Sequence, residues 1–256
     1  MAIGGKNVTF IRTACPVVGS NLAPEIDPLF IGMLHDMKAK GKQYLYINNQ
    51  SADSASDPRL AESRCESNRV AAIRALSESS EFKETFHVVS FAHDSTFYKD
   101  ATEVNAQELK IRFISHLNRG EQGYFLPNSF KSKPENLVRI YEIINEVHAK
   151  YFEGKSVLSA EERQEFLHVA YAAISKFIIT EMQIDAANIT CKDGVDRAAG
   201  SFANLVKIAQ PDVDSKLLLW SLSFPAVVNH ARPPKGHRHI VSIATLKRID
   251  RSQISG

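Results

Sequence analysis

The feature that most constrains the fold is a recurring order of a short apolar run, a polar segment and a helical pattern. The run Tyr44–Ile47 precedes the small and polar stretch Asn48–Asp57, and the run Phe86–Phe91 precedes His93 and Asp94. A strand, a helix and a second strand in this order favour parallel pairing. Ligands of open α/β sheets usually bind beyond the carboxyl ends of the strands. The sequence therefore predicts a functional rim at these polar segments.

A third apolar run, Ala187–Thr190, leads directly into the segment with the clearest chemistry. That segment is Cys191-Lys192-Asp193-Gly194-Val195-Asp196-Arg197, and small residues over Ala198–Ala209 predict a helix after it, which Pro211 ends. A helix N-terminus attracts anions, and an arginine can hold two oxygens of a phosphate at once. The same positive field stabilises a thiolate. The pattern predicts a loop that binds a phosphate ester and attacks it with Cys191, and Gly194 is expected to have positive φ.

The rest of the chain predicts an α/β protein with a mainly parallel sheet flanked by helices. We expect one domain over residues 1–256 with a mainly helical elaboration at about 102–184. Apolar spacing and caps predict helices starting near Pro28, Asn105, Pro134 and Ser159, and another around Val70–Phe82. Residues 1–28 are expected to be an irregular segment with one short β-like run, Val8–Ile11. Further expectations are a buried helix Ser215–Leu222 around Trp220, a turn or extended run Pro225–Asn229 and an amphipathic end Ile240–Ile249.

Composition limits the classes of function. The chain has 256 residues, of which 44% are hydrophobic, and these suffice for a large core. A net charge of +2 is too mild to predict a nucleic-acid partner. Three widely spaced cysteines disfavour a disulfide framework and suit a reducing compartment, and residues 1–34 have neither a signal-peptide nor a membrane-spanning pattern. We therefore expect a soluble, cytoplasmic protein.

The loop from Cys191 to Arg197 resembles the signature loop of the cysteine-based phosphatase superfamily. It is most similar to phosphoinositide phosphatases secreted by intracellular bacterial pathogens, and Asp193 and Asp196 stand at the two acidic positions of Sac-type lipid phosphatases. Weaker similarity covers Gly41–Asn48 and Asp94–Tyr98, so the resemblance involves a small part of the chain.

The resemblance implies a strand–loop–helix core like that of protein tyrosine phosphatases and delivery into a host cell as an effector. Cys191 would form a cysteinyl-phosphate, Arg197 would hold the phosphate oxygens and Lys192 would contact a further ring phosphate. The loop residues Asp193 to Asp196 would complete the substrate site. One residue departs from the pattern, because the family usually has Ser or Thr where this chain has Ala198.

Two other segments supply candidate site residues. An inositol hydroxyl is a poor leaving group and needs a general acid, for which Asp94 is the first candidate, Asp193 the second and His93 the third. The segment His230–His239 is rich in cationic side chains. Its members Arg232, Lys235 and Arg238 are predicted to bind further phosphates or to contact an anionic membrane, and a solvated surface loop is the alternative. Its histidines lack a regular metal-ligand spacing, so no metal and no cofactor is expected.

These observations predict a metal-independent phosphomonoesterase that acts on phosphoinositides or inositol polyphosphates. A protein tyrosine or dual-specificity phosphatase is an alternative. A module that binds a phosphorylated ligand without hydrolysing it is another, and Ala198 is the residue that suggests it. A buried structural cysteine and an unrelated surface arginine would also produce the spacing of Cys191 and Arg197. The sequence leaves the oligomeric state open.

Overall fold

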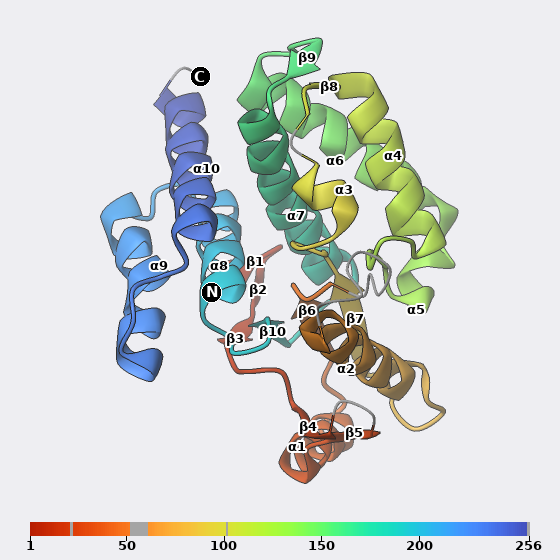
Figure 1. Cartoon of the computed structure of the whole chain (residues 1–256). Coiled ribbons are helices and arrows are strands. Elements are labelled where there is room, and N and C mark those ends of the chain that lie inside the picture. Colours follow the sequence, from red (N-terminus) through yellow and green to blue (C-terminus); the bar gives the residue numbers. More distant parts are fainter. Residues whose placement is uncertain (21–22, 52–60, 101, 255–256) are drawn as a thin grey trace. The chain divides into compact units, whose positions relative to one another are not determined.

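The computed structural model describes residues 1–20, 23–51, 61–100 and 102–254. These residues fall into two compact units, and Figure 1 shows the elements of both. The first unit comprises Met1–Lys99, His116–Lys133 and Ile178–Gly194, and the second comprises Asp100–Ser115, Pro134–Phe177 and Val195–Gly256. Most of the stretch predicted as a helical elaboration, about 102–184, therefore belongs to the second unit, which also holds the C-terminal helices.

The first unit contains a four-stranded, all-parallel sheet, so the described chain is an α/β structure with helices around a parallel sheet, as the sequence predicts. The strand order is β3 (Thr9–Ile11), β10 (Ala186–Thr190), β6 (Tyr44–Asn48) and β7 (Phe86–Ser90). Figure 1 shows these four strands side by side. The strands β10, β6 and β7 are buried along their whole length, which explains why their sequences are apolar rather than alternating.

The prediction of an irregular N-terminal segment is wrong in part. The strand β3 joins the sheet beside β10, where Asn188 is in register with Ile11. Two short antiparallel hairpins flank β3, one formed by β1 (Ala2–Ile3) and β2 (Lys6–Asn7), the other by β4 (Val17–Ser20) and β5 (Ala23–Ile26). Strands of two to four residues have too little periodicity to stand out from a Gly- and Pro-rich background.

Helices α1 (Pro28–Ala39) and α2 (Ala61–Glu78) pack on one face of this sheet. Asp27 caps α1 by accepting a hydrogen bond from the Leu29 amide at 2.8 Å, and Gly41 follows its end with a φ of +62°. The core that the helices share with β6 and β7 is aromatic, with edge-to-face contacts of Phe30 with Tyr44, Tyr46 and Phe86. The polar loop predicted after β6 is described only to Ser51, and residues 52–60 lie outside the described part of the chain.

Two of the remaining helices, α4 and α7, begin where their capping residues predict. Asn105 accepts hydrogen bonds from the amides of Gln107 and Glu108 at the start of α4, and Ser159 and Glu162 cap α7 reciprocally. The bounds are α3 (Thr96–Lys99), α4 (Ala106–Arg119), α5 (Asn128–Lys131), α6 (Pro134–Phe152), α7 (Ala160–Glu181), α8 (Asp196–Ala209), α9 (Ser215–His230) and α10 (Gly236–Ile254), with a short hairpin of β8 (Val104–Asn105) and β9 (Val157–Leu158).

In the second unit, α8 packs against α9 and α10 (Figure 1). The small residues at the start of α8 permit this packing. Ala198 and Ala199 are fully buried, and a Cβ added to Gly200 would lie 2.2 Å from the Ser242 hydroxyl of α10. A larger side chain at Gly200 would therefore separate α8 from α10.

The prediction for the segment after Pro211 is wrong in two respects. Helix α9 continues to His230 and contains Pro225, where a turn was expected. Trp220, expected in the core, is 71% exposed, whereas Leu218, Leu222 and Ala226 are buried. The sequence shows that both faces of this helix are apolar, but it does not show which face meets α8 and α10.

Candidate functional site

Cys191 follows the inner strand β10 directly and is 4% exposed. Because β6, β7 and β10 are parallel, the residues after them lie at one edge of the sheet, and Asp94 follows β7 at this edge. The strand β6 separates β10 from β7, so the axes of β10 and β7 are about 10 Å apart. The sheet thus brings Cys191 and Asp94 to the same rim although 96 residues separate them in the sequence.

Asp94 lies in the turn between β7 and α3, and its side chain is 19% exposed. The Lys99 ammonium lies 3.7 Å from its carboxylate. The neighbouring His93 is buried, and its ring lies 5.5 Å from the ring of Tyr98. Asp193, the second candidate for the general acid, is exposed on the loop itself. Asp94 is therefore the candidate acid that combines partial burial with a place on the rim.

A segment from the N-terminal part of the chain runs beside β10 and the Cys191 loop. Thr13 accepts a hydrogen bond from the Thr190 hydroxyl at 2.6 Å through its carbonyl, and its own amide donates to Asn188 Oδ1 at 3.3 Å. The Cys15 amide donates to the carbonyl of Lys192 at 3.1 Å. These bonds hold the backbone of residues 13–15 against the first half of the loop.

Gly194 has the backbone conformation that the sequence predicts. Its φ is +67°, which is the left-handed region that favours glycine. A Cβ at this position would lie 2.5 Å from the carbonyl oxygen of Thr13. The loop therefore needs glycine for two separate reasons, its own dihedral angle and the close approach of the N-terminal segment.

Arg12 is a candidate site residue that the sequence interpretation missed. Burial lowers the pKa of its guanidinium, and the charge of a Cys191 thiolate opposes this effect, which places the two groups near each other. The β-like run Val8–Ile11 was the available signal, because Arg12 follows it directly. The pairing of β3 with β10 places Arg12 at the carboxyl edge of the sheet, and this pairing is visible only in the fold.

The second half of the loop begins α8. This helix starts at Asp196, two residues earlier than predicted, so the buried Arg197 belongs to its first turn. The N-cap residue is Val195, whose side chain offers no hydrogen bond to the first amides of the helix. The N-terminus of α8 is therefore left without the Ser, Thr, Asp or Asn cap that commonly satisfies these amides.

Four predicted binding residues come together at the start of α8. The Arg232 guanidinium donates to both carboxylate oxygens of Asp196, at 3.1 and 2.8 Å, and the Lys235 amide donates to the same carboxylate at 3.1 Å. Burial raises the pKa of Asp196, but the hydrogen bonds from Arg232 and Lys235 and the charges of Arg232 and Arg238 together hold it below its ordinary value. The basic segment 230–239 is thus attached to the loop through Asp196, and Lys192 remains exposed.

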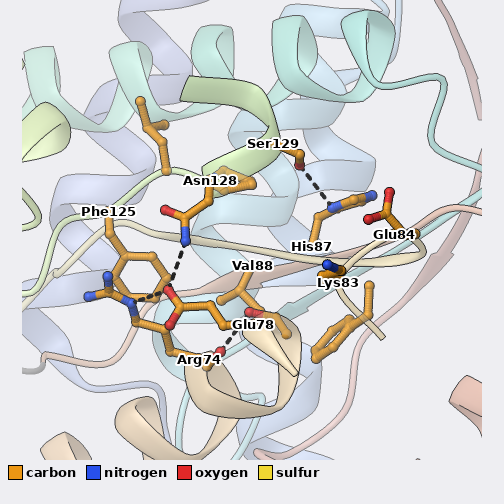
Figure 2. Close-up of a pocket in the computed structure, with 13 residues that line it drawn as sticks. Arg74, Glu78, Lys83, Glu84, His87, Val88, Phe125, Asn128 and Ser129 are labelled. Atoms are coloured by element: carbon orange, nitrogen blue, oxygen red, sulfur yellow. Dashed lines mark hydrogen bonds and ion pairs between the residues drawn. The ribbon is translucent and has the colours of Figure 1, made fainter. Parts of the chain in front are cut away.

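A cavity of about 270 Å³ lies elsewhere in the first unit, beside the edge strand β7. Figure 2 shows Arg74 and Asn128 directed at Glu78, and Ser129 directed at the ring of His87. The charges that line the cavity cancel, because two cations (Arg74 and Lys83) face two carboxylates (Glu78 and Glu84). A cavity without net charge does not suit a ligand with several phosphates, and residues 191–197 do not line it.

Comparison of the chain with protein-family models, with curated proteins and with solved structures finds no match. Among the described residues, no group of three or more His, Cys, Asp or Glu side chains is arranged to hold a metal ion. The described helices are all too short or too polar to cross a membrane.

Proposed function

We propose that the chain is a metal-independent phosphomonoesterase of the cysteine-based type, with a core like that of protein tyrosine phosphatases. The observation that carries the proposal is the local order at Cys191: a buried parallel strand, a loop with a left-handed Gly194, and a helix with Arg197 in its first turn and an apolar N-cap. This order supplies a nucleophile, loop amides and a helix N-terminus in one continuous segment.

In the proposed reaction the Cys191 thiolate attacks phosphorus. The S–P bond forms while the P–O bond to the leaving alcohol breaks, and Asp94 gives its proton to the departing oxygen. Water then attacks the cysteinyl-phosphate, and its proton passes to a general base, for which the Asp94 carboxylate is the candidate. Inorganic phosphate leaves and the thiolate is restored. Arg197 holds the phosphate oxygens, and Arg12 adds positive charge beside the sulfur in both steps.

We propose phosphoinositides or inositol polyphosphates as substrates. Lys192 is exposed on the loop, and Asp196 attaches the basic segment 230–239 to the start of α8. Together these residues offer more positive charge than a single phosphate requires. The three widely spaced cysteines suit a reducing compartment, and the resemblance to secreted effectors extends the proposal to the cytoplasm of a host cell.

The test is release of phosphate from phosphoinositides, inositol polyphosphates and phosphotyrosine peptides by the purified chain. We expect activity on the inositol compounds and its loss in Cys191→Ser, with Cys15→Ser as the matched control because Cys15 lies next to the loop without belonging to it. Activity on the peptides alone would replace the proposal with a protein tyrosine phosphatase. Equal activity of wild type and Cys191→Ser would eliminate cysteine-based catalysis.

A second function, phosphate binding without turnover, is favoured by Ala198. A hydroxyl in this place would support the departing thiolate, and Ala198 is buried without one. Under this proposal inositol phosphates bind wild type and Cys191→Ser with equal affinity, and neither protein releases phosphate. Calorimetry on both proteins distinguishes this outcome from the enzyme.

A further inference from the structure

Helix α9 carries five large apolar side chains on its exposed surface. They are between 55% and 71% exposed and comprise Leu217, Trp220, Phe224, Val227 and Val228, which we call the apolar stripe. At 3.6 residues per turn, they fall within an arc of roughly 100°. The buried residues Leu218, Leu222, Pro225 and Ala226 occupy the opposite arc. The helix is therefore apolar on two faces, and the described fold covers one of them.

Positive charge surrounds the C-terminal end of this stripe. The helix ends at His230 and continues into the basic segment 230–239, in which Lys235 is exposed and Arg232 pairs with Asp196, and Lys216 is exposed near the start of the helix. Asp212 and Asp214, the nearby carboxylates in sequence, precede the helix. A 16-residue helix is about 24 Å long, so they lie at the end away from the basic segment.

We propose that the apolar stripe of α9 and the basic segment 230–239 form a docking face for an anionic lipid bilayer. Trp, Phe, Leu and Val on one side of a helix, with Lys and Arg beside them, match a helix that lies in the membrane interface. The aromatic rings enter the headgroup region while the cations meet anionic lipids. Charge complementarity selects this partner, because a neutral apolar partner would derive no benefit from the basic segment.

The inference does not rest on the proposed catalysis, because phosphatidylserine carries no phosphomonoester and its binding needs no turnover. The two proposals are nevertheless compatible. Arg232 connects the basic segment to Asp196 at the start of α8, so a bilayer bound to this face would meet the segment that adjoins the loop.

The sequence supplies the probe for the test, since Trp220 is the single tryptophan of the chain. Titration of the full chain with phosphatidylcholine vesicles containing about 30 mol% phosphatidylserine should shift its emission to the blue. Brominated acyl chains should quench the emission, and pure phosphatidylcholine should bind at least about tenfold more weakly. Binding should also weaken between low salt and about 0.5 M salt because screening shortens the range of surface charges.

Phe224→Glu should reduce binding by about tenfold or more, because it places a charge at the bilayer surface where an aromatic ring would insert. Val138→Glu on α6 is the matched control, since Val138 is 59% exposed, as is Phe224. Val228→Glu provides a second change within the stripe, and circular dichroism checks the fold of each variant.

Three results would overturn the inference. One is the absence of any blue shift or quenching with the anionic vesicles, and another is equal binding of Phe224→Glu and Val138→Glu. The third is a blue shift that develops without lipid as protein concentration rises, together with a dimer in sedimentation, because a second copy would then cover the stripe.

Discussion

Gly194 is the loop residue whose identity the backbone determines most directly. Its left-handed φ would be strained in any other residue, and the Thr13 carbonyl occupies the space that a Cβ would need. The sequence predicts the first requirement from the position of a lone glycine in the segment from Cys191 to Arg197. The second comes from a residue 181 positions away and is visible only in the fold.

Gly194→Ala should destabilise the protein more than Gly41→Ala. Gly41 has a similar φ of +62° but no atom within 4 Å of an added Cβ, so it measures the backbone strain alone. The additional cost at Gly194 should be about 1–3 kcal/mol, the usual range for overpacking. Urea unfolding of the two variants measures the difference. Equal free energies of unfolding would mean that Thr13 moves aside without cost.

Under the proposed function, Ala198 is the residue that bears on the second chemical step, hydrolysis of the cysteinyl-phosphate. If hydrolysis of the cysteinyl-phosphate is slow because the hydroxyl is missing, rapid mixing should show a burst of released alcohol before a slow steady state. Ala198→Ser should raise the steady-state rate about tenfold and reduce the burst. Ala199→Ser is the control, since both alanines are fully buried. A burst that persists unchanged in Ala198→Ser would assign the slow step elsewhere.

Among the secondary-structure elements, the edge strand β7 carries a buried histidine with a role in stability. His87 donates through Nε2 to Gln43 Oε1 at 2.7 Å. Burial lowers the pKa of its imidazole to about 4, and Glu84 opposes this effect. In the unfolded chain the same group titrates near its ordinary value of about 6.5. Between these two values the unfolded state binds more protons, so acid favours unfolding.

We therefore expect the free energy of unfolding to fall as the pH is lowered from about 6.5 to about 4, with this group contributing roughly 2–3 kcal/mol. His87→Gln should lose this part of the pH dependence. His35→Gln is the control, because His35 is half-exposed on α1. Denaturant midpoints from pH 7 to pH 4 give the comparison. Parallel curves for wild type and His87→Gln would mean that His87 is already charged in the folded state.

The elements also show where sequence patterns succeed and fail. Capping residues correctly locate the starts of α1, α4 and α7, because a cap is a local hydrogen bond. The pairing of β3 with β10 was not predicted, and the exposed face of α9 was predicted wrongly. A three-residue strand forms only beside a partner, and a helix with two apolar faces is oriented only by what packs on it.

For the whole chain, the parallel sheet decides which distant residues share a rim. Asp94 reaches the edge that carries Cys191 through the order β10, β6, β7.

Under the proposed function, Asp94→Asn should slow hydrolysis of inositol phosphates by about 100-fold or more and flatten the basic limb of the pH profile. Substrates with good leaving groups should be spared. The measurement is kcat against pH for both substrate types, with Asp100→Asn as the control, because Asp100 is a nearby carboxylate that follows α3 and pairs with Arg163. An equal loss on both types would leave Asp193 as the candidate acid.

The sequence by itself determined the parallel α/β class, the starts of α1, α4, α6 and α7 and a Cys191–Arg197 loop between a strand and a helix. These features follow from local periodicity, caps and spacing, which a single chain displays directly. Only the tertiary structure shows that Arg12 lies near Cys191, that Asp196 forms an ion pair with Arg232 and that Trp220 is exposed. Each of these features depends on contacts between segments far apart in the chain. The free energy of such contacts cannot be predicted from the sequence of either segment alone.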